Sequence, residues 1–142
     1  MIITIDSGVL LKAYFPDETG HTEAQSLISD YARGAVTFHA PNLITYEIIN
    51  ACLVASRMAR LSKERAKELM SEMLGIEIAG EDIEPLKDRI FDISIKHHLS
   101  AYDGAYIAVA ESKRMPFLTA DKKLFNNLKH HFSFVKWIED YP

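Results

Sequence analysis

The sequence predicts an α/β fold in which helices cover both faces of a central, mainly parallel sheet. Two observations support this class: short apolar runs with the length of buried strands, and amphipathic stretches with helical spacing that alternate with them. The 142 residues fit one domain, and the apolar share of 48% is typical of globular proteins. Because no repeat, linker or low-complexity run divides the chain, we expect residues 1–142 to form a single domain.

Five short apolar runs are expected to be strands. The first, Ile2–Ile5, is β-branched throughout, which suits a strand buried on both faces of a parallel sheet. In chain order, the five expected strands are residues 2–5, 36–38, 76–78, 116–119 and 134–136.

The segments between these runs carry apolar residues at helical spacing. Asn42 and Ser62 are the expected starting residues of two of the helices, and Ser100 that of a third. The expected helices are residues 9–15, 20–32, 42–60, 62–74, 85–98, 100–114 and, from 121 or 122, to about 130.

Charge and cysteine content exclude several classes of protein. With 20 acidic and 16 basic residues, the chain is not a basic protein that coats nucleic acid. The single cysteine, Cys52, excludes a disulfide-stapled scaffold, and no stretch approaches the roughly 20 apolar residues of a membrane helix. The first residues do not resemble a signal peptide, so we expect a cytoplasmic protein with no membrane association.

The charge is unevenly distributed along the chain. Residues 1–112 carry a net charge of −7, and residues 113–142 carry +3. The basic residues near the fourth expected strand are either contacts for RNA phosphates or a solvated surface. They are Lys113, Arg114, Lys122, Lys123 and Lys129.

Two aspartates follow expected strands. Asp6 comes directly after the first strand, and Asp121 lies two residues after the fourth. In parallel sheets ligands bind beyond the carboxyl ends of the strands, so the two carboxylates share one crevice if these strands are neighbours. The alternative interpretation is helix capping, for which aspartate is also favoured.

Two further acids lie on apolar helix faces. Glu47 falls inside the apolar arc of its helix, where a carboxylate needs a metal or other partners; alternatively it reaches water at the edge of the arc or pairs with an arginine. Asp103 shares its face with Tyr106 and Ile107, and with Ser100 it also forms a capping box. Four converging carboxylates without arginines would repel one another, and a hard divalent cation, Mg²⁺ or Mn²⁺, would remove that conflict.

At these residues the sequence resembles the PIN-domain nucleases, and most closely the VapC-type toxins of toxin–antitoxin systems. The resemblance spans nearly the whole chain and consists of four segments in order. These are residues 5–11 with Asp6, 41–53 with Glu47 and Asn50, 99–108 with Asp103, and 117–124 with Asp121.

The resemblance implies a three-layer α/β/α fold with about five parallel strands. It also implies an Mg²⁺- or Mn²⁺-dependent endoribonuclease that cleaves RNA phosphodiesters by metal-activated water. Asp6, Asp103 and Asp121 would hold the metal, and Glu47 would complete the catalytic acids. The hydroxyls of Ser7 and Thr119 would contact these acids rather than the metal, and Asn50 would either orient Glu47 or contact RNA.

Partners are also implied by the resemblance. A small antitoxin would lay a helix on the segments at about 42–60 and 62–74, which contain Met58, Met70 and Met73, although ordinary core packing explains most of these side chains equally well. A homodimer is implied as well. The alternative function is a catalytically silent PIN fold that acts as an RNA-binding or regulatory module.

Overall fold

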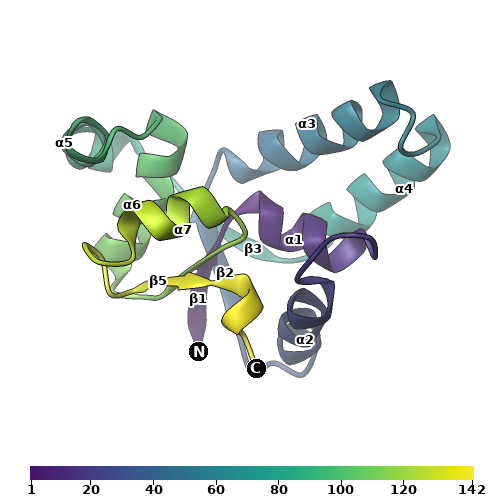
Figure 1. Ribbon diagram of the computed structural model, residues 1–142, viewed down its shortest axis with the longest axis horizontal. Coiled ribbons are helices and arrows are strands. Elements are labelled where there is room, and N and C mark those ends of the chain that lie inside the picture. Colours follow the sequence, from purple (N-terminus) through teal and green to yellow (C-terminus); the bar gives the residue numbers. More distant parts are fainter.

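The computed structural model describes all 142 residues and confirms the predicted α/β class (Figure 1). Five strands form one sheet in the order β3-β2-β1-β4-β5, and every neighbouring pair is parallel. The strands are β1 (Ile2–Ile5), β2 (Thr37–Pro41), β3 (Ile78–Glu81), β4 (Phe117–Thr119) and β5 (Val135–Trp137).

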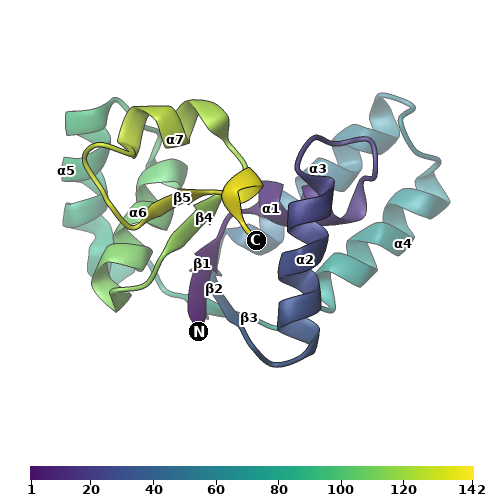
Figure 2. The same cartoon turned by 60° about the horizontal axis from the view of Figure 1, so that its bottom comes forward.

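Helices lie on both sides of the sheet. Figure 2 shows α5, α6 and α7 on one side and α1 to α4 on the other, with α3 and α4 packed together as a hairpin. The α-helices are α1 (Ser7–Tyr14), α2 (His21–Ala32), α3 (Ile44–Arg57), α4 (Lys63–Leu74), α5 (Lys87–His97), α6 (Ala101–Lys113) and α7 (Lys122–Leu128). Two short 3₁₀ helices, η1 (Glu84–Leu86) and η2 (Ile138–Asp140), complete the chain.

The pairing of β1 with β4 is the feature that positions the site. Ile5 lies opposite Leu118 in this ladder, so the first residues beyond both strands emerge side by side. The two strands are separated by more than a hundred residues in the sequence, yet they are central neighbours in the sheet. The condition that the strands preceding Asp6 and Asp121 be neighbours is therefore met.

Asn42 does not cap α3, contrary to the expectation. The backbone N–H of Asn42 donates to the carbonyl of Glu81 at 3.0 Å, and residues 42–43 form a turn between β2 and the helix. The helix begins at Ile44 instead, after Leu43, which provides no side-chain cap. The Asn42 amide lies against Gly80, at a point where a Cβ atom would clash with it.

Several other element boundaries also differ from the expectation, and those of β3 and α5 are two examples. Strand β3 begins at Ile78, which pairs with Phe38 and is the last residue of the expected strand 76–78. Pro85 lies in η1 rather than in a continuous helix, and α5 begins two residues later at Lys87. Both differences arise because the partner strand and the preceding turn, not the local apolar pattern, set where each element begins.

Helix α6 is the most deeply buried helix. Every residue from Gly104 to Ala110 is buried, between the sheet and α5. Gly104, near the start of this helix, faces α5. A Cβ atom at Gly104 would clash with the Ser94 hydroxyl and lie 3.2 Å from the Ile90 carbonyl. No helix is both long enough and apolar enough to span a membrane.

Candidate active site

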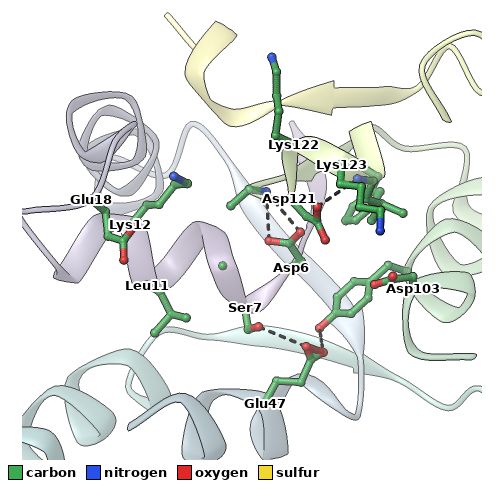
Figure 3. A pocket seen from close by; sticks show the side chains of 15 residues that line it. Asp6, Ser7, Leu11, Lys12, Glu18, Glu47, Asp103, Asp121, Lys122 and Lys123 are labelled. Carbon is green, nitrogen blue, oxygen red and sulfur yellow. Dashed lines mark hydrogen bonds between the residues drawn. The ribbon is translucent and has the colours of Figure 1, made fainter. Parts of the chain in front are cut away.

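A pocket of about 590 Å³ opens beyond the carboxyl ends of β1 and β4 (Figure 3). All four predicted acids line it, although they come from four separate segments of the chain. Asp6 follows β1, Glu47 lies in the first turn of α3, Asp103 in the first turn of α6, and Asp121 precedes α7. The fold therefore brings together the side chains that the sequence singled out.

Asp6 is held by hydrogen bonds on both carboxylate oxygens. Its Oδ1 accepts from the N–H of Val9 at 3.1 Å and so caps α1. The Thr119 hydroxyl donates to Oδ2 at 2.5 Å, and the N–H of Ala120 approaches both oxygens at 3.3 Å. Burial nevertheless raises the pKa of Asp6 to about 6, because desolvation outweighs these donors; the charge of Glu47 raises it further.

Glu47 is oriented by two neutral donors rather than by an arginine. The Tyr106 hydroxyl donates to its Oε1 at 2.7 Å, and the Ser7 hydroxyl donates to its Oε2 at 3.2 Å. Tyr106 is only 2% exposed, and its ring stacks on Phe117 with centroids 5.6 Å apart. Burial, followed by the charge of Glu47, raises the pKa of Tyr106, so the phenol stays protonated and remains a donor.

Asp121 and Asp103 both lie at helix starts. Asp121 accepts from the N–H of Leu124 at 3.0 Å and caps α7, while its own N–H donates to Thr119 at 3.0 Å. The N–H of Asp103 donates to the Ser100 hydroxyl at 3.2 Å, as the capping box predicts. Burial raises the pKa of Asp103, and the charges of Asp121 and Glu47 raise it further. Asp121 therefore both caps a helix and lines the pocket, whereas α6 is capped by Ser100 beside Asp103.

The donor set fits a hydrated divalent cation. Every predicted acid supplies oxygen, and none of the four forms a salt bridge with a lysine, arginine or histidine. No three His, Cys, Asp or Glu side chains converge tightly enough to form a complete cage. Mg²⁺ does not require one, because it takes one or two carboxylates and keeps several waters.

The three predicted supporting residues differ in where they lie. Ser7 contacts Glu47, and Thr119 contacts Asp6 and links it to Asp121. Asn50, by contrast, is exposed on α3, does not line the pocket and makes no hydrogen bond to Glu47. Asn50 lies about one helical turn after Glu47 on α3, beyond the part of the helix that borders the pocket.

Two pocket residues were missed as site residues by the sequence analysis. Tyr106 was noted only as part of an apolar face, although a single hydroxyl in a run of small apolar residues is a usable signal. Lys12 lines the pocket with Lys122 and Lys123, but it follows two leucines on a short helix and gives no signal of its own. Among the other basic residues, Lys113 lies 3.5 Å from Glu81 and Lys129 covers Phe125, both outside this pocket.

Comparison with known proteins connects this arrangement to a family. The family model described as PIN domain matches residues 3–131. "Ribonuclease VapC3" of Pyrobaculum aerophilum is 28% identical over 127 residues, which cover 87% of this chain and 92% of that protein.

Two solved structures share the fold at lower sequence identity. The crystal structure of PAE2754 from Pyrobaculum aerophilum aligns with a TM-score of 0.70 at 20% identity, covering 98% of this chain and 93% of that one. A toxin–antitoxin complex from Klebsiella pneumoniae aligns with a TM-score of 0.55 at 17% identity, covering 94% of this chain and 95% of that one.

Proposed function

The chain belongs to the PIN domain family, and from that premise we propose that it is a divalent-metal-dependent endoribonuclease, the toxin of a toxin–antitoxin pair. The observation that carries this proposal is the pocket itself, where four carboxylates from four segments meet without a cationic partner. A catalytically silent module would have no reason to retain a partly buried, mutually repelling set of acids. The similarity to ribonucleases of the VapC type supports RNA as the substrate.

Asp6, Asp103 and Asp121 are the residues that would hold the metal, directly or through water. A bound Mg²⁺ or Mn²⁺ would supply an acidified water and neutralise charge on the phosphate oxygens. The protein holds these acids in place, and their partial burial costs free energy of desolvation. Thr119 positions two of the acids, because its hydroxyl donates to Asp6 and accepts from the N–H of Asp121.

Glu47 would help to position or deprotonate the attacking water. Its two oxygens accept hydrogen bonds from Tyr106 and Ser7, which give the carboxylate a defined orientation. Hydrolysis by this arrangement uses water as the nucleophile and does not use the 2′-hydroxyl of the RNA. The products would carry a 5′-phosphate and a 3′-hydroxyl.

The test compares wild type with Asp6→Asn and Asp103→Asn on total RNA, with and without EDTA, and sequences the RNA ends. We expect wild type to produce discrete new 5′-phosphate ends only when metal is present, and both variants to lose most of this activity. Cleavage that persists in EDTA, or full activity in both variants, would contradict the proposal. Binding of RNA without any cleavage, together with a melting temperature that Mg²⁺ does not change, would favour the silent module.

The antitoxin is expected to dock beside the pocket. An apolar cleft of about 480 Å³ between α1 and α3 shares Leu11 and Glu18 with the carboxylate pocket. Its lining includes Val54, which is 42% exposed, and Met58, which is 77% exposed, so the cleft presents apolar surface to an amphipathic helix. Met73, which the sequence placed either at this surface or in the core, belongs to the core. Co-purification with the product of a neighbouring small gene, and its loss in Met58→Glu, would test this docking.

We also propose a homodimer, with α5 as the contact. Phe91 and Ile95 are 66% and 65% exposed and lie one turn apart on this helix. A two-fold axis would bring the same pair from each chain together. We expect a dimer in light scattering for wild type and a monomer for Phe91→Glu. A monomeric wild type at micromolar concentration would contradict the dimer but not the nuclease.

A further inference from the structure

The carboxylate pocket has a second, cationic side. Lys12, Lys122 and Lys123 line the same pocket as the four acids, and none of the three pairs with a carboxylate. Figure 3 shows Lys12 on the side away from Asp103, with Asp6 and Asp121 between them. Lys123 lies on the same side as Asp103 in this view, so the cationic side of the pocket consists of Lys12 and Lys122.

Lys12 is unusual because it is nearly buried without an acidic partner. The residue is only 9% exposed, and its ammonium donates to the Thr19 carbonyl at 2.5 Å and approaches the Thr19 hydroxyl at 3.4 Å. Glu18, the other acid of the pocket on this side, is engaged by Arg60 at 3.2 Å. No carboxylate forms a salt bridge with Lys12, although Glu139 lies near its stem, so the ammonium retains capacity to interact with an anion.

The loop after α1 holds this lysine in place. Gly20 adopts a φ of +80°, and a Cβ atom there would lie 3.3 Å from Lys12 Cδ and 2.9 Å from Glu139 Cγ. Only glycine combines this backbone conformation with such a close approach. The loop thus closes over the aliphatic stem of Lys12 and leaves the ammonium at the wall of the pocket.

Lys122 approaches the same aromatic ring as Lys12. The Lys122 ammonium lies 4.7 Å from the centroid of the Trp137 ring, and the Lys12 ammonium lies 5.8 Å from it. Both ammonium groups therefore lie close to Trp137, and a phosphate bound there would be attracted by both charges. Lys12 is six residues after Asp6 along α1, a rise of about 9 Å, which one or two nucleotides of an extended strand can span.

On the premise of the proposed nuclease function, we propose that Lys12 and Lys122 form a subsite for a phosphate of the RNA backbone next to the scissile one. The acids would then act at the phosphodiester that is cleaved, and the two lysines would position the RNA strand on one side of it. Such contacts are electrostatic and independent of the base sequence. Removing one would weaken binding of any single strand and reduce its dependence on salt.

The experiment measures binding of a fluorescein-labelled oligouridylate to the full chain in EDTA, by anisotropy over a range of salt concentrations. We expect Lys12→Met and Lys122→Met each to weaken binding roughly tenfold at low salt. Each should also reduce the slope of log K against log salt by about 0.7, the value for one phosphate contact on a single strand. Lys12→Arg should retain the wild-type slope, and Lys67→Met, an exposed lysine on α4, is the matched control.

The outcomes separate this subsite from the nuclease proposal and from a purely structural role. If Lys12 only closes the loop, Lys12→Met will lower the melting temperature while both methionine variants keep the wild-type salt slope, and the subsite is refuted. A wild type that does not bind the oligonucleotide refutes it as well. If cleavage fails but the slopes fall as expected, the subsite stands and the nuclease proposal fails.

Discussion

Replacing Asp6 with asparagine should stabilise the metal-free protein at neutral pH, although it should abolish activity. The pKa of Asp6 is raised from 3.8 to about 6, chiefly because its carboxyl is desolvated. The folded state therefore binds this proton more tightly than the unfolded state does. The contribution of Asp6 to the free energy of unfolding is most favourable below the unfolded pKa, is lost as the pH rises from about 4 to about 6, and stays lost above that range.

The size of the effect follows from that difference in pKa. A rise from 3.8 to about 6 corresponds to about 3 kcal/mol of free energy of unfolding. Asparagine removes this penalty, but it also loses the charge-assisted hydrogen bonds from Thr119 and Ala120, and the carboxyl of this half-buried residue keeps some contact with water. We therefore expect a net gain of about 1–2 kcal/mol, or a melting temperature higher by roughly 3–6 °C for a chain of this size.

The assay is thermal melting of wild type, Asp6→Asn and Asp92→Asn in EDTA across a pH series. Asp92 is exposed on α5, so its variant controls for removal of a surface charge. The Asp6→Asn variant should melt above wild type at about pH 8, and the difference should shrink to nearly nothing at about pH 4. Adding Mg²⁺ should then raise the melting temperature of wild type more than that of the variant.

Two results would refute this reasoning. One is a variant that is no more stable than wild type at about pH 8, which would mean that ionised Asp6 is not held at a cost. The other is a stabilisation that persists unchanged in acid, which would assign the effect to packing rather than to the carboxylate charge.

Two further predictions concern the residues around the site. Tyr106→Phe should lower kcat for RNA cleavage about tenfold with little change in KM, because Glu47 loses the donor at 2.7 Å. In a Glu47→Gln background, the same substitution should have no further effect on kcat. Equal effects in both backgrounds would contradict the coupling between the two residues. Gly104→Ala should lower the free energy of unfolding in urea by about 1–2 kcal/mol despite the better helix propensity of alanine, because its Cβ would clash with Ser94. Adding Ser94→Ala should recover part of the loss, and no recovery would place the clash on the Ile90 carbonyl instead.

The fold class could be predicted from the sequence because the local pattern reports local structure. Apolar β-branched runs such as Ile2–Ile5 became strands, and Ser62 and Ser100 began helices as expected. The failures occurred where a distant partner decided the outcome. Asn42 did not cap a helix because Glu81 paired with its backbone, and β3 begins at Ile78 because Phe38 is its partner in the ladder.

The sequence by itself determined which acids are chemically unusual: Asp6 and Asp121 after strands, Glu47 and Asp103 on apolar faces. Only the tertiary structure decided their neighbours. The pairing of β1 with β4 brings Thr119 to Asp6 across 113 residues, and the packing of α6 brings Tyr106 to Glu47 across 59. Local spacing determines which face of an element a side chain occupies. Which residues of other elements that side chain contacts depends on strand order and helix packing, and both are set by the burial of the whole core.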